Sequence, residues 1–259
     1  MGTEVRLEHD GPIARITFHS PNGINMLSTA SMAALEAHLK EVEQHSEIRI
    51  VIFSGEGRTF VAGADIAELS AAPGDAGRTL SRRGQQCMNK IANFEHAVTI
   101  AAINGHALGG GCELAIACDL RVMAEDATIG FPEVSLGLIP GWGGTQRIFL
   151  QLGPAKARRM ILTGTPLTGK VAAEAELVNE AVPAEDVMKK ADELARQVLD
   201  RGPSAVRRVK RVMCATEAAW FERGLSLERE AFGEAFIGEE AREGLRAFLE
   251  KRKPAWANA

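Results

Sequence analysis

The sequence predicts an α/β fold in which most neighbouring strands run parallel and the carboxyl-terminal quarter is helical. Strand-like and helix-like segments alternate over residues 4–185, as they do when a helix crosses over between successive parallel strands. The strand signals then stop, and residues 186–252 read as three or four helices separated by Gly202-Pro203, Gly224 and Gly238. With 46% hydrophobic and 25% charged residues, the chain has the composition of an ordinary soluble globular protein.

The amino-terminal elements are a hairpin and a helix. Residues 4–18 read as two strands around the turn Asp10-Gly11-Pro12, because apolar and polar side chains alternate beside it. Ser28 or Thr29 can cap the helix that follows, since a hydroxyl oxygen accepts a hydrogen bond from an unpaired N–H group of the first turn. The apolar positions of this helix recur at helical spacing and are Leu35, Leu39 and Val42.

The middle of the chain repeats strands and helices. Three further strands are expected there, at residues 48–53, 98–103 and 120–123. Helices are expected at residues 80–95 and directly after the glycines that end at Gly111. The small-residue segment 58–66 and the polar stretch 70–84 fit neither pattern, so a loop near a ligand is expected in this part of the chain.

The chain is expected to divide into a core, residues 1–195, that holds the active site and a helical region, residues 196–259, that mediates assembly. The helical region holds large aromatic side chains that include Trp220, Phe221, Phe232, Phe236 and Phe248. These exceed what a few short helices can bury among themselves, so a second subunit is expected to cover them.

Charge and cysteine usage narrow the function classes. The formal net charge of -4 gives no overall attraction to nucleic acid or to an anionic membrane, which favours a small-molecule substrate. No apolar run approaches the ~20 residues of a membrane span, and no targeting segment is visible. The four irregularly spaced cysteines indicate neither a zinc site nor a disulfide framework. They suit a reducing compartment, so we expect a cytoplasmic protein, with a processed organellar form as the alternative.

Two glutamates stand where charge is unexpected. Glu113 follows three glycines and precedes an uncharged run of small residues, and Glu133 lies in a short apolar segment. An unpaired buried carboxylate is costly, so two of them indicate acid and base chemistry. The glycines let a substrate oxygen approach backbone N–H groups at a helix amino terminus, which is a common way to build an oxyanion hole. Cys112, beside Glu113, has apolar neighbours and no base in sequence, which favours a packed core thiol over a nucleophile.

Five segments in a fixed order resemble the crotonase superfamily, also called the enoyl-coenzyme A hydratase/isomerase family. The resemblance extends over nearly the whole chain. The segments are Phe60-Val61-Ala62-Gly63-Ala64-Asp65-Ile66, Asn104 to Leu114, Phe131 to Pro140, Gly143-Gly144-Thr145-Gln146-Arg147 and Arg242-Glu243-Gly244.

The resemblance implies a spiral of ββα units, a trimer or a dimer of trimers, and thioesters of coenzyme A (CoA) as substrates. It implies that the backbone N–H groups of Ala64 and Gly110 bind the thioester carbonyl oxygen. It also matches Glu113 and Glu133 to the pair of acids in the hydratases of the family. Having both acids favours hydration.

The implied reaction is the syn addition of water to a trans-2-enoyl-CoA, giving 3-hydroxyacyl-CoA, in fatty-acid or related degradation. Negative charge then builds on the carbonyl oxygen, where two N–H donors stabilise it. We assign Glu113 to deprotonate the water that attacks Cβ, and Glu133 to anchor that water and to protonate Cα. No metal and no cofactor is expected, since CoA is part of the substrate.

CoA carries phosphates, so basic side chains are expected near its adenosine end. Arg58 is the first candidate, and Lys251 and Arg252 are weaker ones. Where many relatives carry a lysine, this chain has Ala67, so a phosphate contact there is not expected. The backbone predicted to hold the adenine and pantetheine belongs to Ala62, Ala64, Asp65 and Ile66.

Two other functions compete with hydration of a simple enoyl thioester. The same oxyanion hole would serve another crotonase reaction, namely double-bond isomerisation or the hydration of a dienoyl or branched thioester. A relative that binds RNA without catalysis is the alternative of a different class. The acidic balance and the intact pair of glutamates speak against it.

Overall fold

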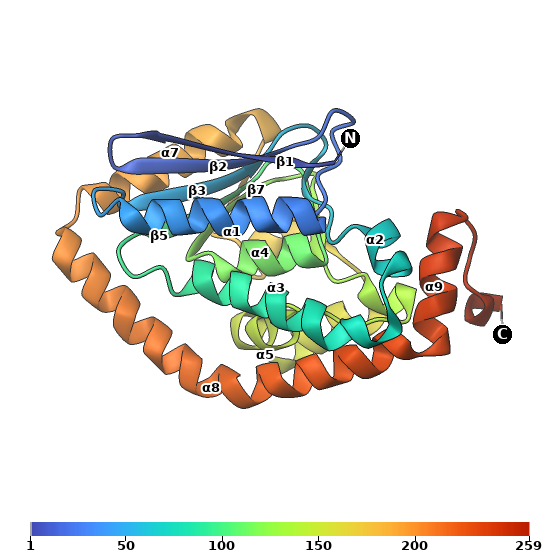
Figure 1. Cartoon of the computed structure of the whole chain (residues 1–259). Coiled ribbons are helices and arrows are strands. Elements are labelled where there is room, and N and C mark those ends of the chain that lie inside the picture. The colour runs from blue at the N-terminus through green and yellow to red at the C-terminus, as the bar shows by residue number, and fades with distance from the viewer. Residues whose placement is uncertain (1, 259) are drawn as a thin grey trace.

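The fold contains two β-sheets, and the chain adds strands to both of them as it winds (Figure 1). In the computed structural model, which describes residues 2–258, the first sheet has the order β1-β2-β3-β5-β7-β10 and the second the order β4-β6-β8-β9. The strands of the first sheet are β1 (Glu4–Asp10), β2 (Ile13–His19), β3 (Ile50–Gly55), β5 (Val98–Ile103), β7 (Leu120–Ala124) and β10 (Glu180–Val182). Those of the second are β4 (Thr59–Val61), β6 (His106–Leu108), β8 (Thr128–Gly130) and β9 (Leu167–Thr168).

Each of the turns that begin with β3, β5 and β7 adds one strand to each sheet and then a helical segment. β3, β5 and β7 are parallel neighbours in the first sheet, and β4, β6 and β8, which follow them after short turns, are parallel neighbours in the second. The antiparallel pairing of β1 with β2 is the predicted hairpin. The α/β fold and the spiral of ββα units are therefore confirmed.

The helices pack on both sides of the first sheet (Figure 1). The longer ones of the core are α1 (Thr29–Gln44), α3 (Gly77–Ala92), α4 (Gly110–Ala117), α5 (Gly144–Thr163) and α7 (Val187–Leu199). The short ones are α2 (Ile66–Ala71) and α6 (Gly169–Glu174), and four 3-10 turns lie at η1 (Gly74–Ala76), η2 (Glu133–Leu136), η3 (Ala184–Asp186) and η4 (Ala255–Asn258). β5 is buried at every residue, because helices cover both of its faces.

The beginning of α1 shows how the sequence determines a helix terminus. Of the two predicted caps, Ser28 is the one used, and its hydroxyl accepts a hydrogen bond from the N–H group of Ser31. The Ser31 hydroxyl in turn accepts from the N–H group of Ser28 at 2.8 Å. This reciprocal pair satisfies two N–H groups that have no partner inside the helix.

The predicted loop near a ligand is shorter than expected. Of residues 70–84, those from Gly77 onward belong to α3, whose buried side includes Ser81, Gly84 and Gln85. The polar sequence of residues 77–84 did not show where α3 begins, because the first half of that helix buries small and amide side chains instead of large apolar ones.

The helical region is made mainly of α8 (Pro203–Ile237), which runs along the lower edge of the molecule in Figure 1, and α9 (Glu239–Leu249), which lies near α2 at the right. The expected break at Gly224 is wrong, because α8 continues through it. A Cβ atom at residue 224 would overlap the side chain of Gln146, so this glycine serves close packing against α5. The domain boundary expected after residue 195 falls within α7, and the division into core and appendage stays a prediction.

The aromatic side chains of this region differ in burial, and Phe221 is half-buried beneath the guanidinium of Arg147. Phe232 and Phe236 are buried within the chain, where their rings stack at 5.9 Å in a small cluster with Leu138. Trp220 is 72% exposed and Phe248 is 56% exposed. The expectation that the whole set needs a second subunit is therefore too broad, and only part of the aromatic surface is left uncovered.

Candidate active site

The two predicted acids lie on the wall of one cavity of about 420 Å³. The parts of the chain that meet there include the loop between β4 and α2, the amino termini of α1 and α4, the middle of α3, η2, and the segment 138–142. Phe232 of α8 and Phe248 of α9 also line it. Segments that are far apart in sequence thus surround a single, mostly apolar space.

Glu113 is held at the base of this cavity. It lies in the first turn of α4 and is 2% exposed. Its Oε1 atom accepts hydrogen bonds from the N–H groups of Trp142 at 2.7 Å and Gly144 at 2.8 Å. Burial raises the pKa of Glu113 well above its usual value, and nearby carboxylates add to this, while the two N–H donors oppose it. The side chain is therefore fixed in direction and easily protonated.

Glu133 faces the same space from η2. Its Oε1 atom lies 3.0 Å from the position that a Cβ atom would occupy on Gly109, and its buried Oε2 atom has no hydrogen-bond partner among the described residues. Burial raises the pKa of Glu133 to about 8. A protonated carboxyl group at neutral pH is therefore the favoured state, and its free oxygen can bind a ligand.

The segments that carry Ala64 and Gly110 lie against each other. A Cβ atom on Gly63 would stand 3.1 Å from the carbonyl oxygen of Leu108 and 3.8 Å from the Gly110 nitrogen. Gly63 has a φ of 111° and Gly109 a φ of 52°, both in the region that favours glycine. Because Gly110 begins α4, its N–H group has no acceptor inside the helix.

Comparison with known proteins agrees with this geometry. The family model described as enoyl-CoA hydratase/isomerase matches residues 8–259. The chain belongs to the enoyl-CoA hydratase/isomerase family. It is 42% identical over 252 residues to a probable enoyl-CoA hydratase of Bacillus subtilis, covering 96% of this chain and 97% of the relative. It is 37% identical over 250 residues to a short-chain-enoyl-CoA hydratase of Clostridium acetobutylicum, covering 96% and 95%.

Solved structures support the same assignment. The enoyl-CoA hydratase of Bacillus anthracis shares 34% identity, with a TM-score of 0.79 over 96% of this chain and 97% of that one. An enoyl-CoA hydratase/isomerase of Mycobacterium paratuberculosis shares 27% identity, with a TM-score of 0.87 over 95% of this chain and 98% of that one. The likeness thus covers the whole spiral and the helices after it.

The residues predicted to hold CoA in this enoyl-CoA hydratase/isomerase family member fall into two groups. The segment predicted to contribute its backbone lines the cavity, and it comprises Ala62, Ala64, Asp65 and Ile66. The carboxylate of Asp65 caps α2 by accepting from the N–H groups of Ala67 and Glu68. Arg58 and Lys251 are exposed and are not among the described residues that line the cavity, and Arg252 pairs with Glu243. Their contact with CoA phosphates stays a prediction.

Two neighbours of the site were missed from the sequence. The indole of Trp142 packs between Gly84 of α3 and Gly110 of α4, at either of which a Cβ atom would overlap it. Glu228 of α8 is 4% exposed and accepts hydrogen bonds from the same turn that holds Glu113. Glu228 lies four residues before the buried Phe232, and residues at this spacing share one face of a helix. That spacing was the signal that could have indicated that Glu228 is buried.

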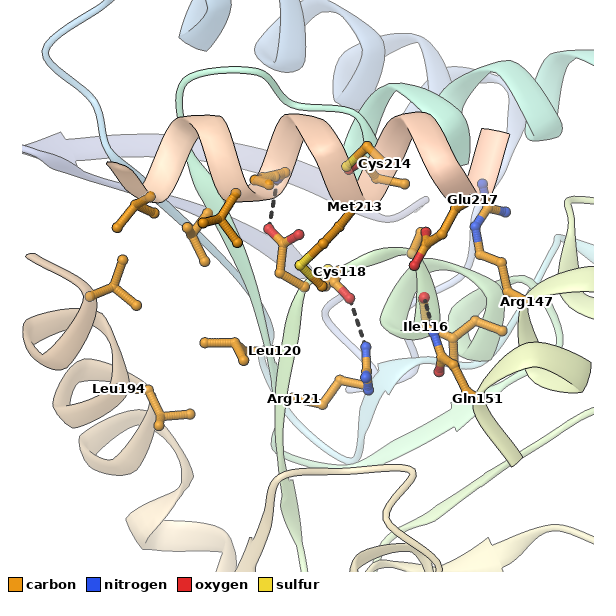
Figure 2. Close-up of a pocket in the computed structure, with 18 of the residues that line it drawn as sticks. Ile116, Cys118, Leu120, Arg121, Arg147, Gln151, Leu194, Met213, Cys214 and Glu217 are labelled. Carbon is orange, nitrogen blue, oxygen red and sulfur yellow. Dashed lines mark hydrogen bonds and ion pairs between the residues drawn. The ribbon is translucent and has the colours of Figure 1, made fainter. Parts of the chain in front are cut away.

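A larger cavity of about 780 Å³ lies between α7, α8 and β7 (Figure 2). Figure 2 shows Leu194 and Met213 lining it, and Arg121 hydrogen-bonded to the carbonyl oxygen of Cys118 at 2.7 Å. Lys210 pairs with Asp119 at 2.7 Å on the same side. These polar groups of the larger cavity have hydrogen-bond partners within the fold. In the smaller cavity, by contrast, the buried Oε2 atom of Glu133 has none among the described residues.

The described residues, 2–258, contain no helix long and apolar enough to cross a membrane. The same stretch contains no group of three or more His, Cys, Asp or Glu side chains placed to hold a metal ion. Cys112 is fully buried, and burial raises the pKa of its thiol well above the usual value, which agrees with a core thiol.

Proposed function

We propose that this chain adds water to the double bond of a trans-2-enoyl-CoA, giving a 3-hydroxyacyl-CoA, with Glu113 and Glu133 as the proton-transferring groups. The observation that supports it best is the presence of two buried carboxyl groups in one cavity with the amino terminus of α4. Hydration requires one proton to leave water and one to reach Cα. Two carboxyl groups in different protonation states fit that need.

The thioester carbonyl oxygen accepts hydrogen bonds from the N–H groups of Ala64 and Gly110. These donors stabilise the negative charge that builds on that oxygen as water adds to Cβ, and the amino terminus of α4 adds its positive end. The small side chains at both positions leave the backbone accessible.

Glu113 removes a proton from the attacking water, and Glu133 anchors that water and gives its own proton to Cα. The two N–H groups on Oε1 of Glu113 stabilise its carboxylate form, which suits a base. Glu133 has no such donors on its Oε2 atom and keeps its proton at neutral pH. Glu113 gains one proton and Glu133 loses one, so the net change in the substrate is the addition of one water, with no redox cofactor. Transfer of a proton from Glu113 to Glu133, directly or through solvent, then restores both groups for the next turnover.

A thioester panel tests this proposal. Purified protein is mixed with trans-2-enoyl-CoA thioesters of different chain lengths and with dienoyl and branched ones, and loss of the conjugated-enone absorbance is followed. We expect products heavier by one water. A product of unchanged mass would indicate isomerisation, and inactivity on every thioester would contradict the proposal.

The proposal includes self-association of the chain into a trimer or a dimer of trimers. Large apolar side chains are exposed on α5 and α8, among them Leu162 at 72%, Val212 at 64% and Trp220 at 72%. Apolar surface of this kind is covered in oligomers by a second copy of the chain. The four free thiols suit a reducing compartment, and we propose the cytoplasm.

A further inference from the structure

Four consecutive backbone N–H groups at the start of α5 point alternately at two buried carboxyl groups. Trp142 and Gly144 donate to Oε1 of Glu113 at 2.7 and 2.8 Å. Gly143 donates to Oε1 of Glu228 at 2.6 Å, and Thr145 donates to its Oε2 at 3.0 Å. The turn formed by residues 142–145 therefore donates hydrogen bonds to Glu113 on one side and to Glu228 on the other.

This alternation depends on the backbone of Gly143. Its φ of 104° lies in a region that side chains disfavour, and it turns successive N–H groups toward opposite sides. Without an acceptor on the far side, the N–H group of Gly143 would be buried and unpaired, at a cost of roughly 1–3 kcal/mol. Glu228 supplies that acceptor.

We propose that Glu228 is a positioning residue for hydration: it fixes the turn whose other N–H groups orient Glu113. The inference rests on the role proposed for Glu113 as the base. It makes α8, which begins beyond the spiral, a structural component of the active site.

The contacts of Glu228 require a carboxylate. All four of its partners are donors: the N–H groups of Gly143 and Thr145, the Thr145 hydroxyl at 2.5 Å and the side-chain amide of Gln85 at 3.1 Å. A glutamine at position 228 would present an NH₂ group to one of these donors and leave it unpaired. A negative charge is also favourable at the amino terminus of a helix such as α5.

Burial raises the pKa of Glu228, and its four donors oppose that rise by stabilising the carboxylate, whose charge acts on the proposed acid and base. The ionisable groups that face it are Glu113 on α4, Glu133 on η2 and the buried Arg147 on α5. Its carboxylate raises the pKa of both Glu113 and Glu133. Removing that charge lowers both pKa values, so both limbs of the pH profile are expected to move to lower pH.

The test compares Glu228→Gln with Glu228→Asp in the full chain, and uses Glu222→Gln, an exposed glutamate on the same helix, as the matched control. We expect Glu228→Gln to lower kcat by roughly 10–100-fold with little change in KM. Its pH profile shifts toward lower pH, and Glu228→Asp, which keeps the charge, restores the limbs toward their original positions. Glu222→Gln behaves as the unmodified protein.

A stability loss alone would overturn the inference. If Glu228→Gln lowers the melting temperature but leaves kcat and the pH profile of the folded protein unchanged, Glu228 is structural only. If that variant does not fold, Thr145→Val removes one donor to Glu228 and keeps the backbone. It is expected to lower kcat at unchanged KM, and a normal kcat would also refute the inference.

The two proposals fail in different ways. Activity of the unmodified protein that is lost in Glu113→Gln but retained in Glu228→Gln removes only the positioning role. Inactivity of the unmodified protein on every thioester removes the proposed function, and the positioning role with it.

Discussion

Glu113 and Glu133 are chemically identical, and their surroundings give them different roles. Glu113 receives two backbone N–H groups on one oxygen, whereas Glu133 has a buried oxygen without a partner among the described residues. Burial raises the pKa of both groups. The two donors on Glu113 oppose that rise and stabilise the carboxylate that a base needs, whereas the free oxygen of Glu133 suits an acid that keeps its proton.

Replacing either glutamate by glutamine tests these roles at the residue scale. Glu113→Gln and Glu133→Gln are each expected to lower kcat by roughly 10²–10⁴-fold, because each amide can no longer transfer the proton. Steady-state hydration of the best thioester gives the rate, and thermal melting checks that the fold is kept. Glu174→Gln, at an exposed position, is the control. Normal turnover in both site variants would refute the assignment.

The pH dependence of kcat provides a second test at this scale. Since burial raises the pKa of Glu133 to about 8, the group holds its proton below that pH and loses it as the pH rises through it. We therefore expect kcat to fall on the alkaline side of about pH 8, measured in buffers of constant ionic strength. A rate that stays level up to about pH 10 would contradict Glu133 as the proton donor.

At the scale of elements, glycines determine how closely the helices approach the site. Gly84 on α3 and Gly110 on α4 leave the space that the indole of Trp142 fills, and Gly224 lets α8 lie against Gln146 of α5. Interiors are close-packed, so a single added methyl group at such a position forces a neighbour to move.

Gly84→Ala tests this arrangement. The new Cβ atom would overlap the indole of Trp142, and the backbone N–H group of the same residue donates to Glu113. Alanine gains roughly 1 kcal/mol in helix propensity, but overpacking of a core costs roughly 1–3 kcal/mol. We expect a lower melting temperature and a lower kcat, measured against Gly74→Ala, where the added atom would make an ordinary contact of 3.9 Å with Ile237 and no overlap. A more stable variant with full activity would show that the indole moves freely.

At the scale of the whole molecule, α8 links the active site to the exposed surface. One side of it holds Glu228 in the site, and the same helix presents Trp220 to solvent at 72% exposure. A helix of this length spans about 50 Å, so one element can serve both catalysis and assembly.

The proposed assembly predicts a size larger than one chain. Light scattering after size exclusion is expected to return three or six chains, and Trp220→Glu is expected to weaken the association, because a charge cannot be buried cheaply between subunits. Glu222→Gln, on the same helix, serves as the control. A monomer at all concentrations would contradict the proposed assembly.

The sequence by itself determined the alternation of strands and helices, a helix cap at Ser28 or Thr29, and the unusual pair Glu113 and Glu133. Those features depend on local spacing and on the cost of burying charge, both of which can be read from the order of the residues alone. Only the tertiary structure decided that α8 passes unbroken through Gly224 and that Glu228 meets the turn that holds Glu113. These depend on contacts between residues 78 and 85 positions apart, where the neighbour determines whether a glycine ends a helix or a glutamate is buried.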